Sequence, residues 1–350
     1  MPALVPSDQS EVLMKVRHKV LLIATTVASS LIAVVPATQA KPNGSSTTSD
    51  KAVQFWTNAR VRRAITRDFV MNTKTRRFEL RGKPAVPGTI AGTSWANGGR
   101  VVQTTGKVLF SLGATYYVCS ASVVNDIWTD RSIVLTAGHC VYDETNNQFA
   151  DNWVFIPSWD TQPVPMDAEG LFCDSTEYGC WSAQSLIASN AFAQEPGFTV
   201  TATQHDYGFA VVGNGGFSAQ QLDEVAGSQA MDTNSVDIDA ETWAFGYPAQ
   251  GKYKGNDLIY CKGLLTFDTR IGVDWSTYKL GCNMTGGSSG GPWMRDVSEI
   301  GINVGVGTVF SVTSYGYGSS KNLYGPILNT ETAGMFAAAE TVSGNLLYTS

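Results

Sequence analysis

Three residues with complementary chemistry, a histidine, an aspartate and a serine, stand far apart in this chain of 350 residues. The chain has three histidines, and His18 lies near the N-terminus, so a histidine-based mechanism must use His139 or His205. His139 lies in the sequence TAGHC, after a run of strand-forming residues and directly before Cys140. A small-residue turn on one side and a disulfide on the other would fix the imidazole, as a general base requires.

The candidate nucleophile is Ser289 in the sequence GGSSGGPW, residues 286–293. Glycines around two serines permit a tight turn with positive φ, which exposes a hydroxyl and directs neighbouring amides toward one point. That arrangement is what an oxyanion site needs. The alternative is a flexible Gly/Ser linker, but Cys282 before the loop and Pro292 and Trp293 after it are unusual for a linker.

The same loop matches the G-x-S-x-G pattern of α/β-hydrolases at Gly287, Ser289 and Gly291. In that fold the catalytic histidine follows the serine along the chain. No histidine follows Ser289, so the α/β-hydrolase class is excluded.

A carboxylate must orient the imidazole, and Asp206 in QHDYGFAVV is the candidate because it precedes an apolar strand. A buried aspartate there would hold the required tautomer and stabilise the imidazolium. His205 adjoins Asp206 as an alternative base, but neighbours in a strand point to opposite faces. The rival carboxylates are expected in polar turns facing water: Asp126, Asp130, Asp143 and Asp160.

The elements that must position these residues are short strands. Hydrophobic residues make up 43% and charged residues 15% of the chain, which excludes global disorder. From about residue 106, apolar or alternating runs between Gly, Asn, Asp and Pro predict an all-β fold of barrels or sandwiches. The candidate strands are residues 107–111, 114–120, 132–137, 153–157, 209–212, 241–247, 258–266 and 305–312.

Two barrels, residues 101–225 and 226–350, would fit this length and meet near residues 215–236. Residues 331–340 predict a C-terminal helix with Asn329 or Thr330 as its cap.

Residues 1–40 predict an export signal. Basic residues precede an almost charge-free run, Val20 to Val35, and small residues end at Ala40, where we expect cleavage. The alternative, a membrane anchor, is disfavoured because sixteen residues are fewer than the roughly 20 that a spanning helix needs. We therefore expect a secreted protein that has no membrane contact after processing.

Export makes disulfides the preferred state of the six cysteines. No CxxC pair occurs, which disfavours zinc. Pairing between sequence neighbours is the simplest of the possible patterns: Cys119 with Cys140, Cys173 with Cys180, and Cys261 with Cys282.

Charge is distributed unevenly along the chain. Residues 1–40 carry +1, residues 41–100 carry +9 and residues 101–350 carry −16, which gives the net charge of −6. The acidic body argues against a nucleic-acid surface. Residues 41–100 are interpreted as a basic propeptide that docks on the acidic body; the alternative is an extension that stays attached.

The motifs TAGHC, DYGFAVV and GGSSGGPW, in this order, resemble those of the chymotrypsin-like serine endopeptidases, particularly secreted microbial members. The resemblance covers roughly residues 101–348. It implies two antiparallel six-stranded β-barrels with the site between them. His139 would be the general base and acid, Asp206 its orienting carboxylate and Ser289 the nucleophile, with an oxyanion hole from the amides of Gly287 and Ser289.

This sequence departs from the family pattern at two places. Many animal members have Asp before the nucleophile, where it pairs with the new N-terminus; here the residue is Ser288. Removal of a covering propeptide is therefore the preferred route of activation. The position that binds cationic side chains in trypsin-type members is Asn283, so we expect a neutral pocket with Asn283, Thr285 and Ser311 among its walls.

The expected activity is peptide-bond hydrolysis by a monomer without cofactor or metal, with protein or peptide substrates and its own propeptide as partners. Asp223 and Glu224 could hold calcium, but a solvated charged surface is the simpler interpretation. Two alternatives share the fold or the mechanism: a catalytically inactive binding protein, and a secreted ester hydrolase with the same triad.

Overall fold

The computed structural model describes residues 48–80, 92–127, 130–161, 170–270, 272–318 and 321–350, all within the compact unit Ser45–Ser350. The expected export signal lies outside the described residues. Among the helices that are described, none is both long and apolar enough to span a bilayer.

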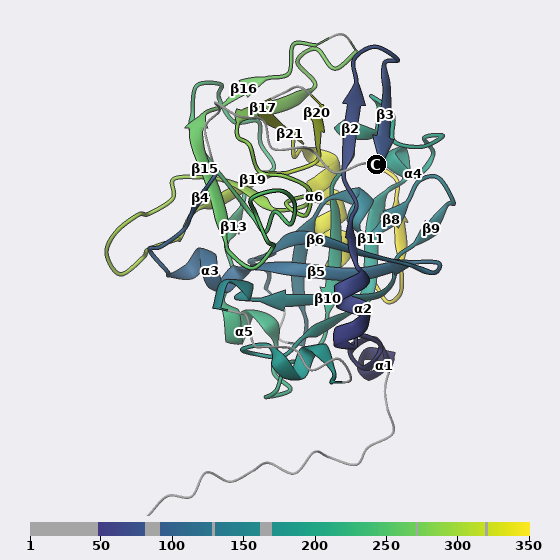
Figure 1. The fold of residues 1–350 in the computed structure, drawn as a ribbon, viewed down its shortest axis with the longest axis vertical. Helices are drawn as coiled ribbons and strands as arrows, with labels where there is room; N and C mark the ends of the chain where they lie inside the picture. The colour runs from purple at the N-terminus through teal and green to yellow at the C-terminus, as the bar shows by residue number, and fades with distance from the viewer. Residues whose placement is uncertain (1–47, 81–91, 128–129, 162–169, 271, 319–320) are drawn as a thin grey trace, which may run out of the picture. The chain divides into compact units, whose positions relative to one another are not determined.

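The first half of the body is a closed barrel of six antiparallel strands (Figure 1). The strands pair in the order β6-β5-β10-β11-β12-β7, and β7 pairs with β6 to close the barrel. Their bounds are β5 (Thr105–Leu112), β6 (Thr115–Val124), β7 (Ser132–Thr136), β10 (Asp151–Pro157), β11 (Trp181–Ser189) and β12 (Gly208–Val212). Their valine, leucine, isoleucine and phenylalanine side chains fill the barrel core.

A tight hairpin joins β5 to β6. Leu112 pairs with Thr115, so Gly113 and Ala114 alone form the turn. Gly113 has φ 55°, a left-handed conformation that glycine adopts at little cost and that suits the twist of a two-residue hairpin. The hairpin fixes the register of β6, the strand that carries the buried Cys119.

The second half is barrel-like and consists of two sheets. One has the order β13-β19-β18-β14-β15-β4, and the other has the order β16-β17-β21-β20-β2-β3. Two strands of the second sheet, β2 (Phe69–Asn72) and β3 (Arg77–Leu80), precede the body in the sequence. The body strands are β4 (Thr93–Ser94), β13 (Ala230–Met231), β14 (Glu241–Gly246), β15 (Ile259–Leu264), β16 (Thr266–Phe267), β17 (Thr277–Gly281), β18 (Pro292–Arg295), β19 (Thr308–Val312), β20 (Tyr315–Tyr317) and β21 (Asn322–Pro326). Tyr278, Met284 and Trp293 lie in the core between the sheets.

Several short elements connect these strands. They are α3 (Arg100–Thr104), η1 (Gly138–Cys140), β8 (Tyr142–Asp143), β9 (Gln148–Phe149), η2 (Trp159–Thr161), η3 (Phe172–Ser175), α4 (Asn190–Ala193), η4 (Ala202–Gln204) and α5 (Leu222–Ala226). The site residues described below lie in or beside these connections.

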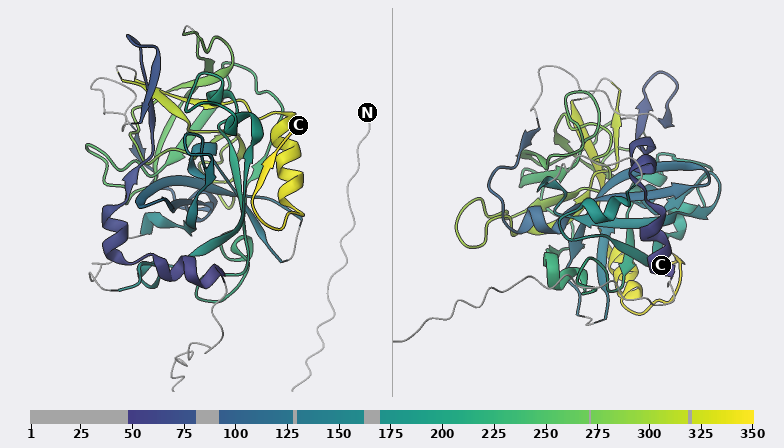
Figure 2. Two further views of the ribbon diagram at one scale, coloured as in Figure 1. Left: turned by 90° about the vertical axis from the view of Figure 1, so that its right-hand side faces the viewer. Right: turned by 60° about the horizontal axis from the view of Figure 1, so that its bottom comes forward.

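The predicted C-terminal helix is confirmed as α6 (Thr330–Ala339). Asn329 is the N-cap, and its side chain forms a capping box with Thr332. The helix packs along β11 and β12 of the first barrel. It is the yellow helix in Figure 2. The last strand, β22 (Leu346–Tyr348), then pairs in parallel with β11.

Residues Thr48–Leu80, here called the N-terminal segment, lie against both halves of the body. The segment contains α1 (Thr48–Phe55), α2 (Asn58–Arg63), β1 (Ile65–Thr66), β2 (Phe69–Asn72) and β3 (Arg77–Leu80). Strand β1 pairs in parallel with β6 of the first barrel, and β2 pairs in parallel with β20 of the second half. The segment therefore crosses from one half to the other (Figure 1).

Candidate active site

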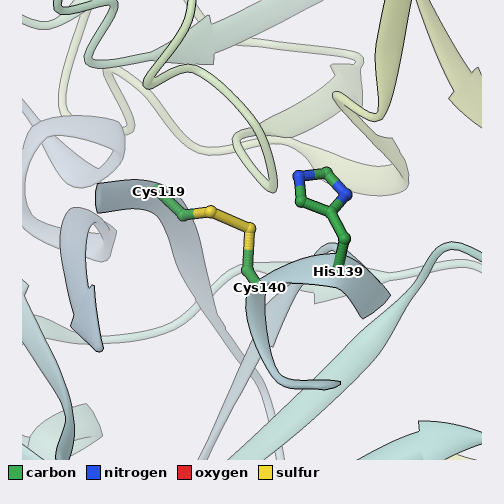
Figure 3. Close-up of side chains that lie close together, drawn as sticks. All are labelled: Cys119, His139 and Cys140. Atoms are coloured by element: carbon green, nitrogen blue, oxygen red, sulfur yellow. A yellow bond between two sulfur atoms is a disulfide. The ribbon is translucent and has the colours of Figure 1, made fainter. Parts of the chain in front are cut away.

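The three disulfides join the sequence neighbours that were predicted to pair: Cys119–Cys140, Cys173–Cys180 and Cys261–Cys282. The first ties β6 to η1, and η1 carries His139 next to Cys140 (Figure 3). Its 21-residue separation corresponds to about 3 kcal/mol in the chain-entropy model.

A possible metal site at this position does not fit the chemistry. Donor atoms of Cys119, His139 and Cys140 lie within 4.8 Å of one another. Both sulfur atoms, however, belong to the disulfide drawn in Figure 3. A metal binds the thiolate form of cysteine, so these sulfurs are not ligands.

His139 and Asp206 form a fully buried pair. The imidazole Nδ1 lies 2.8 Å from Asp206 Oδ2, and the backbone N–H of His139 donates to Asp206 Oδ1 at 2.8 Å. Ser314 Oγ also donates to Oδ2, at 2.5 Å. Because Nδ1 faces the Asp206 carboxylate, the neutral imidazole carries its proton on Nδ1, and Nε2 has the free lone pair of a base. Nε2 is buried and has no hydrogen-bond partner among the described residues.

The loop that carries Ser289 lies close to the first barrel. Gly287 has φ 98° and Gly290 has φ 78°, and a Cβ atom on Gly290 would lie 2.4 Å from Ser120 O. The N–H of Ser120 donates to Ser289 O at 2.7 Å, and its hydroxyl donates to Gly287 O at 2.8 Å. Strand β6 therefore holds the loop of the other half in place.

The Ser289 hydroxyl contacts a residue of the N-terminal segment. Ser289 Oγ donates to Asp68 Oδ1 at 2.8 Å, and the Gly287 N–H donates to the same oxygen at 3.2 Å. All three residues are buried or tightly packed there; a Cβ atom on Gly286 would lie 2.3 Å from Asp68 Oδ2. Burial raises the pKa of the Asp68 carboxyl above its ordinary range, and hydrogen bonds from Ser289 and Gly287 offset part of the rise.

Aromatic side chains enclose the imidazole. Phe69, which follows Asp68, lies edge-on to the His139 ring with 5.4 Å between centroids. Phe198 of the body lies edge-on to the same ring at 5.7 Å and stacks on Phe69 at 3.9 Å. The N-terminal segment thus covers both the base and the serine.

The three expected pocket residues have different surroundings. Thr285 borders a cavity of about 10 Å³ beside Ser289. Asn283 is buried, and its Oδ1 accepts hydrogen bonds from Tyr253 Oη at 2.5 Å and from the Gly92 N–H at 2.9 Å. The Ser311 hydroxyl donates to Pro326 O. The structure therefore brings Thr285 to the site, while Asn283 and Ser311 are bonded to other groups.

His205 faces away from the candidate site. Its Nδ1 lies 2.7 Å from Glu331 Oε2 on α6. Burial alone would raise the pKa of Glu331, but hydrogen bonds from His205, Ser189 and Tyr207 bring it down to about 2. His205 and Asp206 do not pair, as expected, although the residues lie in the turn after η4 and not in a strand.

One rival carboxylate was placed wrongly from the sequence. Asp143 was expected to face water in a polar turn, but it is buried and lies 3.4 Å from Arg67 of the N-terminal segment. The amides of Thr145 and Asn146 donate to the same carboxylate oxygen. A turn of polar sequence is buried here because the segment covers it.

Sequence reasoning missed three residues of the site: Asp68, Ser120 and Ser314. Ser120 and Ser314 are single serines in ordinary strand or loop sequence, and their importance arises from the tertiary contacts given above. Asp68 stands in ITRDFV, within the basic region 41–100, and no recognisable motif surrounds it.

Two solved structures resemble this chain in fold and sequence. Protease Anisep from Arthrobacter nicotinovorans is 33% identical, with a TM-score of 0.56, and the match covers 69% of this chain and 96% of Anisep. A thermostable serine protease, AL20, from an extremophilic microorganism is 31% identical, also with a TM-score of 0.56, and the match covers 69% of this chain and 99% of AL20.

No protein-family model matches the chain. No curated protein matches it either. The two proteases nevertheless have more than 30% identity over nearly their whole length, and the closed six-stranded barrel agrees with this class of protease. The chain therefore belongs to the chymotrypsin-like serine proteases.

Proposed function

We propose that the chain is a secreted serine endopeptidase, made as a precursor, that cuts peptide bonds with His139, Asp206 and Ser289. One observation carries the proposal: a single oxygen, Asp68 Oδ1, accepts hydrogen bonds from the Ser289 hydroxyl and the Gly287 amide. A substrate carbonyl oxygen must likewise lie beside the nucleophile and within reach of an amide donor.

The proposed catalytic steps use these residues as follows. Ser289 Oγ attacks the substrate carbonyl carbon while His139 Nε2 takes its proton, and the oxyanion is stabilised by the amides of Gly287 and Ser289. His139 then gives the proton to the leaving amine, and the C–N bond breaks. Water attacks the acyl-enzyme by the same route and restores the Ser289 hydroxyl. Asp206 keeps Nδ1 protonated and stabilises the imidazolium throughout.

The N-terminal segment is proposed to inhibit the precursor. The Ser289 hydroxyl donates to Asp68 in this state, so it is not available to His139 Nε2. Asp68 presents a side-chain carboxylate, which is a poor electrophile because its negative charge is shared by two oxygens. Contact with Ser289 therefore blocks the nucleophile without forming an acyl-enzyme.

The contacts of residues 92–99 favour a propeptide that ends before Gly92 and not at residue 100. Strand β4 pairs with β15, and Trp95 is buried against Phe245 and Tyr260 of the body. Removal of these residues would expose that aromatic cluster. N-terminal sequencing of the secreted active protein should give a start between residues 81 and 92; a start beyond Trp95 would contradict this boundary.

The activity is tested with processed protein and casein. Ser289→Ala should abolish hydrolysis, because it removes the attacking oxygen, while the fold remains intact by circular dichroism. Ser228→Ala is the matched control, since its hydroxyl contacts Asn125 and not the site. Casein hydrolysis that survives Ser289→Ala would refute the proposal, and hydrolysis of a long-chain ester without casein hydrolysis would favour an esterase.

A further inference from the structure

A buried ion pair lies beside the candidate catalytic base. The guanidinium of Arg67, with a side chain only 4% exposed, lies 2.9 Å from Glu144 Oε2 and 3.4 Å from Asp143 Oδ1. It also donates to the backbone carbonyls of His139 and Tyr142. Both terminal nitrogens of the guanidinium thus donate to acceptors of the body, which is the forked geometry that binds arginine specifically.

All the acceptors in this site belong to the body and not to the removable segment. They lie within residues 139–144, in η1, β8 and the turn that follows them. Asp143 is also held by Asn146, whose side-chain amide donates to Oδ2 at 2.8 Å. The Asp143 carboxylate therefore keeps its position after Arg67 leaves.

Glu144 depends more strongly on the guanidinium. Its side chain is 1% exposed, Oε2 receives Arg67 at 2.9 Å, and Oε1 receives the Thr145 hydroxyl at 3.5 Å, the limit of a hydrogen bond. A buried carboxylate that loses its cation is costly unless another cation or water replaces it. Departure of the N-terminal segment therefore leaves a site that favours a new cationic group.

The position of this site relative to Ser289 indicates which part of a substrate would reach it. Residues before Asp68 pair with β6, and residues after Asp68 pair with β20. Tyr315 and Gly316 of β20 line the cavity beside Ser289 together with Thr285, an expected wall of the pocket for the side chain before the cut. The acyl part of a substrate then lies toward β20 and the leaving amine toward β6, where Arg67 lies.

Space continues beyond the carboxylates. Glu144 borders a cavity of about 480 Å³ that is also lined by Tyr142, Thr145 and Glu195. A second carboxylate, Glu195, adds to the negative charge of the lining.

We infer that Glu144, together with Asp143, forms a subsite that selects arginine or lysine as the residue directly after the scissile bond. The inference rests on the proposed endopeptidase function, because it assigns the subsite to a substrate of the same Ser289. It differs from a purely structural role, in which the two carboxylates only anchor the N-terminal segment and select nothing in the processed enzyme.

Acyl transfer to added amines measures the selectivity of this subsite separately from the step that forms the acyl-enzyme. Processed enzyme is acylated with a peptide ester, and arginine amide, citrulline amide and norleucine amide compete with water for the acyl group. The acceptor nitrogen forms a C–N bond to the acyl carbon as the ester bond to Ser289 Oγ breaks, and the amine proton passes through His139 to Oγ. The readout is the ratio of aminolysis to hydrolysis.

Arginine amide should partition about tenfold better than citrulline amide, its uncharged isostere, because the charged hydrogen bond to Glu144 is lost. Glu144→Gln should remove most of this preference. Glu299→Gln removes a charge of the same kind from the loop after β18 and should leave the preference intact. The citrulline comparison needs no variant, so it remains valid if Glu144→Gln fails to fold.

Equal partitioning of arginine and citrulline amides in an enzyme that hydrolyses the ester would overturn the inference and leave the proposed function standing. A preference that is unchanged in folded Glu144→Gln would also overturn it. Absence of any Ser289-dependent ester turnover would instead overturn the proposed function. The three results are therefore distinguishable.

Discussion

At the residue scale, Asp68 links the geometry of the site to its control. Its carboxylate oxygen takes hydrogen bonds from both the Ser289 hydroxyl and the Gly287 amide. The Gly287 amide is one of the two proposed oxyanion donors, so a group proposed to stabilise the transition state also holds the proposed inhibitory residue. The N-terminal segment is thereby anchored on the groups proposed to be catalytic.

The raised pKa of Asp68 predicts pH-dependent docking. The Asp68 carboxyl has a higher pKa in the docked segment than in the free segment. At a pH between these two pKa values, docking is therefore accompanied by uptake of a proton at Asp68. Affinity is then greatest at low pH and falls as pH rises from about 4, until the raised pKa is passed. A segment with Asp68→Asn cannot titrate at this position and lacks this dependence.

The measurement is calorimetric binding of the separate segment 48–80 to processed enzyme between pH 4 and pH 8. A pH-dependent contribution that does not involve the Asp68 carboxyl is shared by the unmodified segment and the Asp68→Asn segment. The quantity to follow is therefore the dissociation constant of the unmodified segment divided by that of the Asp68→Asn segment. We expect this ratio to rise with pH by at most tenfold per unit. A ratio that stays constant or falls would contradict the assignment.

Ser314 is expected to act through Asp206. Its hydroxyl donates to Asp206 Oδ2 at 2.5 Å, the oxygen that also faces His139 Nδ1. Ser314→Ala should lower kcat by about tenfold, because a hydrogen bond to a buried charge is lost, with a smaller change in KM. Steady-state kinetics on one peptide substrate measure both constants, and a variant that raises KM alone would mean that Ser314 binds substrate instead.

The sequence identified candidate residues where a short motif and the small number of histidines pointed to the same residue. His139, Asp206 and Ser289 could be proposed because histidines are scarce and glycines surround the serine. Asp68 and Ser314 could not be proposed, because neither has a local signature. Their roles depend on a parallel strand pairing and on a buried carboxylate that only the tertiary structure brings to them.

At the element scale, five of the six strands of the first barrel were predicted from the sequence, and β11 was not. The run Ser132–Thr136 became β7, and a run ending at Val212 became β12. Strand β11, Trp181–Ser189, escaped prediction because serine, alanine and glutamine interrupt its apolar residues. Buried pairing on both sides, with β10 and β12, provides the stability that its composition does not indicate.

The pairing of β2 with β20 predicts that the N-terminal segment inhibits the enzyme and is not cleaved at the peptide bond between Asp68 and Phe69. The segment presents the Asp68 side chain to Ser289, so the peptide carbonyl of Asp68 is not the group that receives the Gly287 amide. A synthetic segment 48–80 should inhibit processed enzyme competitively and stay intact between Asp68 and Phe69. Mass spectrometry after prolonged incubation measures this.

Rapid Ser289-dependent cleavage at Asp68–Phe69 would mean that the segment binds as a substrate. The matched control is segment 48–80 with Asp68→Ala, which keeps the β2 sequence but lacks the carboxylate. It should inhibit more weakly than the unmodified segment.

At the scale of the whole molecule, we expect opposite charges to contribute to the docking of the N-terminal segment on the body. Residues 48–80 contain eight basic and three acidic side chains, a net charge of +5, whereas residues 101–350 carry −16. Long-range attraction of this kind is screened by salt, while the buried pair of Arg67 and Glu144 is screened much less. Docking should therefore weaken with salt without being abolished.

Inhibition constants of segment 48–80 at about 50 mM and about 500 mM NaCl measure this contribution. We expect the constant to rise about tenfold, since the Debye length falls from well above 10 Å to a few ångströms. Replacing the exposed Arg63 and Lys74 by glutamine should reduce the salt dependence. A constant that is insensitive to salt would assign the docking to buried contacts alone.

The most direct test of the account is labelling by a fluorophosphonate, which reacts only with a serine activated by a base and an oxyanion site. We expect processed protein to be labelled rapidly at Ser289, Ser289→Ala to remain unlabelled, and the precursor to react more slowly while Asp68 occupies the hydroxyl. Absence of label on processed, folded protein, or label at another serine, would contradict the assignment of Ser289, His139 and Asp206 as the catalytic groups.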